Sequence, residues 1–501
     1  MRNSIPDRCR RGHGCGRSLL VWSLLVLYCS LSMGQAKAQE HAAQSQEPRI
    51  TPEEAKELLG SVDSILEFDS RDTGMKSRGK VKRELAGRDQ VQLYFEERIR
   101  EDEDAKRLQN ESTVLKKFGL IPAGFDLQGF LVELLKEQVA GYYDTKTKTV
   151  YMLDWLPPET QQPVMAHELT HALQDQNFGL ERWTKQADVR NRGAARQIAS
   201  DEAVAARQAV VEGQAMAVMI DFLLAPTGGS LLKSPLIADA IREGMMSGTD
   251  APVMGRAPLY VKELLLFPYR YGLDFIRELL IKQGKQSAYS DVFRNPPVST
   301  RQIMQPETYL SGEQLPPLIP PDFDTLLKPE YKRVDLGAIG EFDVSVMAEL
   351  FGGKRDETSA GAEEGSGGKA SGGTPPIWTQ WRGGYYYASA PVKQRPASSH
   401  TSPEDGSDGQ IAMVYVSRWA SAESAADFAK IYRASMEKRY VTEKPDEPCS
   451  NCAPSGKNSV TTLNTNHGLV SLEVEGTTVL AIESFDANAA NRIRGAVLGH
   501  K

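Results

Sequence analysis

Histidine is scarce in this chain of 501 residues, which contains only seven. Two of them, His167 and His171, are the only histidines between His41 and His400. A metal site built from three histidines is therefore excluded from this long central stretch. Any zinc centre there must combine the two imidazoles with a ligand of another kind, such as a carboxylate.

Cysteine is rarer still, with five residues, of which three lie within the first 29 positions. The other two, Cys449 and Cys452, lie in a stretch rich in Pro, Asp, Ser and Asn. This stretch lacks the strand-to-helix setting of a redox motif and the second Cys pair of a structural zinc site. We predict a local disulfide in an oxidising compartment, with a redox pair or half of a zinc site as alternatives.

Long apolar runs are missing except at residues 19–31, which follow five arginines and precede Ala36-Lys37-Ala38. Residues 1–38 are therefore interpreted as a signal peptide, with an uncleaved anchor as the alternative. The mature chain is expected to be exported, to the periplasm or beyond. No second run of membrane-spanning length is recognised, so no stable membrane insertion is expected after cleavage.

A surplus of basic charge is also absent. The formal net charge is −7, and residues 1–38 contribute six basic residues and one acid, so the mature chain carries −7 − 5 = −12. Nucleic acid is therefore not expected as a partner.

The two central histidines belong to one pentapeptide, His167-Glu168-Leu169-Thr170-His171, in a stretch with helical periodicity. Positions i and i+4 share a helix face, so both imidazoles can bind one zinc ion. Glu168 would lie beside the open coordination position and could take a proton from water there. Pro163 and Gly179 suit the start and the end of this helix. We predict a zinc site with Glu168 as general base.

The third ligand is expected from the next helical segment, residues 200–224. Glu212 is the best candidate, because it lies among small and apolar residues, where an unpaired carboxylate would be costly. Gly213 next to it would let this helix approach the metal helix closely. Asp201 and Glu202 are competitors, but they lie where a helix N-terminus favours acids anyway.

These residues resemble the metal site of gluzincin-type zinc metallopeptidases. In that family, two His of a His-Glu-x-x-His helix and a Glu of a following helix hold the zinc ion. The resemblance implies His167, His171 and Glu212 as ligands and Glu168 as general base.

The chain is also similar, over about residues 120–310, to a narrower group of largely uncharacterised bacterial zincin-like proteins. This similarity rests on four motifs: His167-Glu-Leu-Thr-His-Ala-Leu-Gln-Asp-Gln176, Glu212-Gly213, Phe267-Pro268-Tyr269 and Pro296-Pro297-Val298-Ser299-Thr300.

Two positions depart from these patterns. In thermolysin-like gluzincins an Asp four residues after the ligand Glu orients a ligand His, but Met216 stands here. Gln174 and Asp175 are the candidates for that support. The narrower group tends to carry a His where this chain has Gln305, so the role of that His is not carried over.

A hairpin and an aromatic segment are predicted around the metal helix. Residues 139–143 and 149–153 have the composition of two strands. The hairpin either binds an extended substrate peptide at its edge, as in the zincins that this chain resembles, or caps the helical core. Residues 267–272 are expected to interrupt a helical run. Among them, Tyr269 is our candidate donor to the oxyanion, with packing as the alternative.

The order of segments predicts an α+β protein. Residues 39–118 read as a polar leader and a charged helical segment, which is either a prodomain or the first helices of the catalytic domain. Residues 119–351 are expected to form a mostly helical zincin-like metallopeptidase domain with a short sheet. A flexible Gly/Ser-rich linker, residues 352–376, then leads to a small α+β domain, residues 377–501.

The aromatic residues at the start of the C-terminal domain allow two interpretations. Trp378, Trp381 and residues 385–387 either form a ligand-binding surface or pack in the core of a sheet. No specific function is predicted for this domain.

The leading hypothesis is a secreted zinc-dependent peptidase that acts on peptide or protein substrates. The alternative is a non-catalytic zinc-binding or scaffolding protein of the cell envelope with a peptidase-derived fold. Glu168 favours the enzyme, because a degenerate protease commonly loses its base, whereas Gln305 favours the alternative. The sequence does not indicate an oligomeric state.

Overall fold

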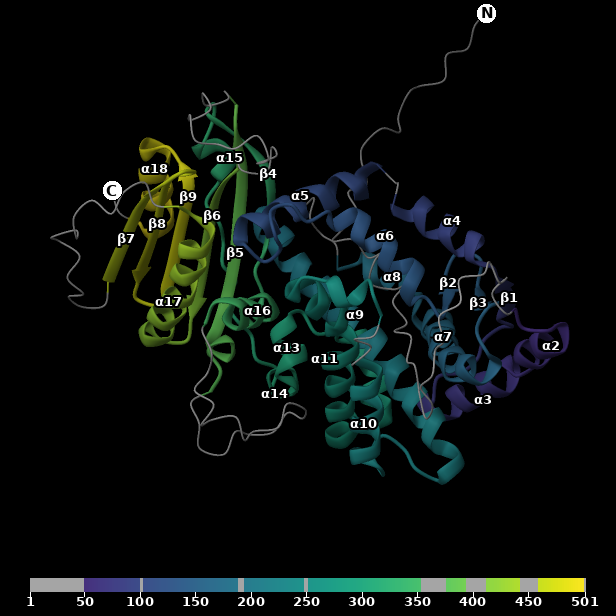
Figure 1. Cartoon of the computed structure of the whole chain (residues 1–501). Coiled ribbons are helices and arrows are strands. Elements are labelled where there is room, and N and C mark those ends of the chain that lie inside the picture. The colour runs from purple at the N-terminus through teal and green to yellow at the C-terminus, as the bar shows by residue number, and fades with distance from the viewer. Residues whose placement is uncertain are drawn as a thin grey trace, which may run out of the picture.

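The computed structural model describes residues 49–99, 102–187, 193–246, 251–352, 375–392, 411–441 and 458–499, which form an α+β protein (Figure 1). The predicted fold class is thus confirmed. The predicted signal peptide, the Cys449–Cys452 pair and residues 353–374 of the predicted linker lie outside the described residues. In Figure 1 a small sheet and a large sheet lie at opposite ends of the molecule, with the longest helices between them.

The N-terminal part is helical and begins at a capping box. The Thr51 hydroxyl accepts a hydrogen bond from the Glu54 N–H at 3.2 Å, and the Glu54 carboxylate accepts one from the Thr51 N–H at 2.7 Å. These bonds satisfy donors that a helix start leaves free. The helices of this part are α2 (Pro52–Gly60), α3 (Val62–Thr73), α4 (Arg88–Ile99), α5 (Asp102–Phe118) and α6 (Leu127–Gln138).

The small sheet has the strand order β1-β3-β2. Its strands are β1 (Lys82–Ala86), β2 (Gly141–Asp144) and β3 (Thr149–Leu153), with β1 parallel and β2 antiparallel to β3. The predicted hairpin is present, and β2 forms one edge. Val150 and Met152 of β3 join the core that includes α3 and the metal helix, whereas Leu153 joins the core on the other side. The segment 39–118 therefore contributes β1 and α3 to the surroundings of the metal helix.

Three long helices occupy the middle of the molecule: α7 (Pro158–Phe178), α9 (Ala194–Leu224) and α11 (Leu259–Gln283). α9 packs against both of the others. α7 is the predicted metal helix; it begins after Pro157, contains Pro163 and ends at Gly179 with φ 68°. Contrary to the expectation of no second run of membrane-spanning length, α9 could cross a membrane by length and composition. Most of its apolar window is nevertheless buried inside the protein.

Two expectations about these helices are wrong. Gly213 serves the contact of α9 with α11 rather than with α7, since a Cβ at Gly213 would lie 2.3 Å from the backbone of Gly272. Residues 267–272 do not interrupt the helix, because α11 continues through Pro268. A proline inside a helix costs roughly 3 kcal/mol, but the buried apolar face of α11 outweighs this cost.

Shorter helices connect and cover these three. They are α8 (Leu180–Lys185), η2 (Ala225–Thr227), α10 (Pro235–Met246), η3 (Met254–Arg256), the π-helical turn η4 (Ser287–Asp291), α12 (Val292–Arg294), α13 (Thr300–Met304), α14 (Pro306–Leu310), α15 (Phe323–Leu326), α16 (Glu341–Phe351) and η6 (Ile377–Gln380).

The large sheet has six antiparallel strands in the order β4-β5-β6-β9-β8-β7. Helices α17 (Ala422–Arg439) and α18 (Ala487–Leu498) pack against it. The edge strand β4 precedes the predicted linker, so the sheet extends across the predicted boundary at residue 351. The strands are β4 (Tyr331–Ala338), β5 (Trp381–Pro391), β6 (Ala412–Trp419), β7 (Asn458–Thr465), β8 (Gly468–Glu475) and β9 (Thr478–Phe485).

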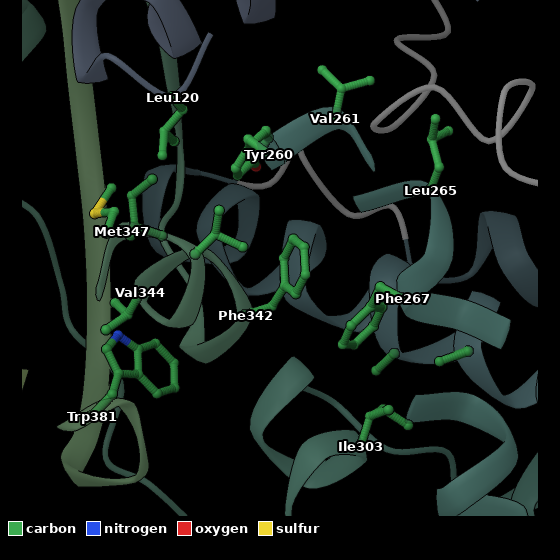
Figure 2. Close-up of a cluster of buried hydrophobic side chains, with 14 of the residues drawn as sticks. Leu120, Tyr260, Val261, Leu265, Phe267, Ile303, Phe342, Val344, Met347 and Trp381 are labelled. Atoms are coloured by element: carbon green, nitrogen blue, oxygen red, sulfur yellow. The ribbon is translucent and has the colours of Figure 1, made fainter. Parts of the chain in front are cut away.

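The aromatic residues of β5 are part of the core. Trp381 and Tyr385 to Tyr387 are each 7% exposed or less, as the packing alternative expects. One hydrophobic core joins α9 and α11 to the large sheet. In Figure 2 its side chains come from α11, α16 and β5, with Phe267, Phe342, Val344, Met347 and Trp381 among them.

Candidate metal centre

His167 and His171 of α7 and Glu212 of α9 converge in the buried interior. One ligand atom from each lies within 4.8 Å of the other two. Among the described residues, this is the group of His, Cys, Asp and Glu that could hold a metal ion. The helical spacing of four puts both imidazoles on one face of α7, and the packing of α9 against α7 brings Glu212 to them.

The distances between the donor atoms fit a small tetrahedral ion. His167 Nε2 lies 3.1 Å from His171 Nε2 and 3.1 Å from Glu212 Oε2, and His171 Nε2 lies 3.5 Å from the same oxygen. Bonds of roughly 2.0–2.1 Å in tetrahedral geometry separate ligand atoms by about 3.3 Å. The three residues therefore form a preformed tripod that could hold a metal ion.

The charges of the tripod depend on one another. Burial raises the pKa of Glu212, but the attraction of His171 and hydrogen bonds from both histidines outweigh it and lower the pKa to about 2. Burial lowers the pKa of His171, but the Glu212 carboxylate outweighs it and raises the pKa to about 9. Without a metal ion, His171 therefore favours its protonated form, whose positive charge balances the Glu212 carboxylate. A bound metal ion would take over this role.

Glu168 lies next to this tripod but is not among its ligand atoms. Its side chain is buried, and burial raises the pKa of its carboxyl, while His171 and His167 pull that pKa down again. A hydrogen bond from the backbone of Tyr143 also favours the ionised form. Glu168 therefore lies close to both the histidines and the edge strand β2. Its carboxylate is a stronger proton acceptor than that of an ordinary glutamate.

Tyr269 comes to the same place from α11. Its ring centroid lies 6.3 Å from that of His167, and its hydroxyl forms a hydrogen bond with Glu212. Burial and the carboxylates of Glu212 and Glu168 keep its pKa well above the usual value, so the phenol keeps its proton and remains a donor. The structure thus brings all five predicted site residues together.

Of the two candidates for orienting a ligand, only Gln174 contacts one. Its Oε1 lies 2.8 Å from Nδ1 of His171. Asp175 instead accepts hydrogen bonds from the Tyr143 hydroxyl at 3.0 Å and from the Leu180 N–H at 3.2 Å. It also pairs with Lys148 at 2.5 Å, so it fastens the hairpin to α7.

Gln208 was not among the residues predicted for the site. Its Nε2 donates to Glu212 Oε1 at 2.7 Å, and its side chain is buried. A signal was available, because Gln208 precedes Glu212 by one helical turn and is polar within an apolar stretch. Met216, where thermolysin-like enzymes have an Asp, is part of the apolar core.

The competing acids of α9 have other partners. Asp201 accepts the Ala338 N–H of β4 at 3.0 Å, and Glu202 accepts the N–H and hydroxyl of Thr300 at 2.9 and 2.8 Å. Gln305 donates to Glu341 at 2.5 Å. These residues link α9 and α13 to the start of α16 and to the large sheet rather than joining the tripod.

Comparison of the chain with models of known protein families, with curated proteins and with solved structures finds no match.

Proposed function

We propose that the protein is an exported zinc-dependent peptidase. The observation that carries the proposal is the convergence of two imidazole nitrogens and one carboxylate oxygen beside a second buried carboxylate, Glu168. The sequence supports the same reading, because these residues form a His-Glu-x-x-His helix and a following ligand Glu. The predicted signal peptide supports export.

The donor set favours zinc. Two nitrogens and one oxygen at tetrahedral spacing leave one position for water or substrate, which is the arrangement of catalytic zinc sites. Magnesium and calcium prefer sites made of oxygen atoms. When bound, a zinc ion would act as a Lewis acid toward the scissile carbonyl and would make water more acidic.

Glu168 has the position and basicity of a general base. Its carboxylate would accept a proton from the attacking water as the water oxygen bonds to the carbonyl carbon. It would then deliver that proton to the leaving nitrogen as the C–N bond breaks. Its raised pKa makes this carboxylate a stronger proton acceptor than an ordinary glutamate, which suits the first transfer.

Tyr269 and strand β2 would position the substrate. The Tyr269 phenol remains a neutral donor beside Glu212 and would stabilise negative charge that develops on the carbonyl oxygen. β2 is an edge strand whose Tyr143 backbone already bonds Glu168. An extended peptide paired with this edge would lie next to the base.

The Glu168→Gln variant tests this proposal. We expect it to keep zinc but to lose peptide hydrolysis by roughly 10²–10⁴-fold, because the amide cannot accept the proton. The measurement is digestion of a broad peptide library, with and without a chelator. Glu159→Gln, at an exposed position in the first turn of the same helix, is the matched control and should keep full activity.

Besides Gln305, the burial of the site favours the scaffold alternative. His167, Glu168 and Glu212 are only 1–2% exposed, and a site that turns over peptides must admit substrate. The alternative predicts stoichiometric metal without any chelator-sensitive cleavage by the wild-type chain. Activity that Glu168→Gln retained in full would likewise contradict the proposed mechanism.

A further inference from the structure

The outer contacts of the metal centre form a directed chain of amide groups that ends on two backbone carbonyls. Gln214 Nε2 donates to the Ala288 carbonyl at 2.6 Å, and Gln174 Nε2 donates to the Val211 carbonyl at 3.0 Å. A carbonyl oxygen accepts hydrogen bonds and cannot donate them. Each glutamine must therefore present its NH2 group to its carbonyl, which determines the orientation of both amides.

The fixed orientation of the Gln174 amide also determines which of its atoms faces the ligand His171. Gln174 Nε2 also donates to Gln214 Oε1 at 2.8 Å, so the two amides agree with each other. The remaining atom, Gln174 Oε1, lies 2.8 Å from His171 Nδ1. Because this oxygen only accepts, Nδ1 must carry the hydrogen. In the neutral imidazole the other nitrogen, Nε2, is then left with its lone pair, and Nε2 is the atom that faces His167 and Glu212.

We infer that Gln174, held in place by Gln214, is a positioning residue that sets the metal-binding tautomer of His171. This inference rests on the proposed function, which supplies the zinc ion. Gln208 acts in the same way on Glu212: its donation to Oε1 leaves Oε2 directed at the two histidines. Both supports are neutral amides, in place of the charged carboxylate that often holds a ligand histidine.

The two histidines differ in this respect. Nδ1 of His167 is buried and has no hydrogen-bond partner among the described residues. No hydrogen bond from the described residues therefore fixes the tautomer of His167, in contrast to that of His171. Of the two imidazoles, the one whose tautomer is fixed is that of His171, and loss of Gln174 would leave its tautomer unfixed as well.

The test compares Gln174→Leu with Gln161→Leu in the mature full-length chain. Gln161 is a matched control, because it is a fully buried glutamine of the same helix whose hydrogen bonds go to the backbones of Leu153 and Leu156. The measurement is the dissociation constant of Zn²⁺ by competition with a chelator, together with the absorption spectrum of the Co²⁺ form.

We expect Gln174→Leu to weaken zinc binding by about 10–100-fold and to change the Co²⁺ spectrum. Gln174→Glu keeps an acceptor for Nδ1 but loses the donor to the Val211 carbonyl, so it should bind zinc more tightly than Gln174→Leu and less tightly than the wild type. Gln161→Leu should lower the melting temperature and leave the zinc affinity unchanged.

Three results would overturn the inference. The first is a folded Gln174→Leu variant with wild-type zinc affinity, which would leave the metal site and the proposed function intact. The second is an equal loss of affinity in Gln161→Leu. The third is a wild-type chain that binds no zinc, which would also overturn the proposed function. If Gln174→Leu does not fold, Gln174→Met takes its place; it is of similar size and also removes the amide acceptor for Nδ1. An unchanged zinc affinity in that variant would also overturn the inference.

Discussion

Two buried polar clusters of this protein differ in how completely they are hydrogen-bonded. In the C-terminal part, both oxygens of Glu483 are paired: Oε1 accepts from Tyr432 at 2.6 Å, and Oε2 accepts from Arg439 at 2.8 Å and from Tyr440. In the metal centre, two imidazole nitrogens face each other at 3.1 Å, and Nδ1 of His167 lacks a partner within the described part of the chain. In the first cluster both carboxylate oxygens have hydrogen-bond partners. In the second, two nitrogens and one oxygen that could bind a metal ion lie close together.

This difference separates a structural cluster from a binding site. Buried polar groups in native proteins are nearly always satisfied, so an incomplete cluster calls for an explanation. The Glu483 cluster joins α17 and β9 to α5, because Lys117 at the end of α5 donates to Ser484 at 2.8 Å and Arg439 bonds the Lys117 carbonyl. Its role is to hold two parts of the chain together. A metal ion would complete the other cluster.

The largest effect is expected where the complete cluster is broken. Glu483→Ala should lower the free energy of unfolding by about 3–5 kcal/mol, because it leaves the buried Arg439 without its carboxylate. The measurement is urea denaturation of the metal-free chain, and zinc affinity should stay unchanged. A second change, Arg439→Met, should recover part of the loss. If Glu483→Ala unfolded like the wild type, the cluster would not hold these parts together.

The incomplete cluster should respond in the opposite way. Glu212→Gln should weaken zinc binding by more than about 100-fold, since even residues outside the ligand shell cost 10–100-fold. The stability of the metal-free chain should fall much less than in Glu483→Ala. Metal analysis and denaturation of the two variants side by side measure both effects. Stoichiometric zinc of unchanged affinity would remove Glu212 from the ligand set.

A smaller effect concerns pH. Burial lowers the pKa of Lys117 to about 8, although Glu483 opposes the shift. Between this value and the usual pKa of about 10.4, the unfolded chain binds more protons than the folded one, so this lysine makes stability rise with pH over that range. Lys117→Met should lose this rise, which amounts to about 1–3 kcal/mol. Denaturation of both proteins at pH 7, 9 and 10 measures the difference, and parallel pH profiles would contradict it.

Local patterns were sufficient for many elements of the fold. The end of α7 at Gly179 and the hairpin of β2 and β3 lie where the sequence predicts them, because caps, turn residues and alternation act over a few residues. The place of β4 in the large sheet was not predicted, because β4 precedes the predicted linker and its partner β5 follows it. The uninterrupted course of α11 through Pro268 was missed because only its packing shows that the proline is tolerated.

The residues of the candidate site likewise include some that the sequence predicts and others that it does not. His167, Glu168 and His171 form one motif whose helical spacing is local, and Glu212 was identified because a carboxylate in an apolar helix needs a partner. Gln208 was overlooked although it lies one helical turn before Glu212. Gln214 could not be predicted, since the carbonyl that it bonds is 74 residues away and nothing in the sequence distinguishes it from other buried amides.

The sequence by itself determined which residues can bind a metal and on which helix face the two histidines lie, because the geometry of a helix is set by its own backbone. Only the tertiary structure decided that Glu212 meets these histidines and that Tyr269 lies beside them. It also decided that the Ala288 and Val211 carbonyls orient the amides behind His171. These contacts depend on how α7, α9 and α11 pack, and packing is a property of side chains that are distant in sequence.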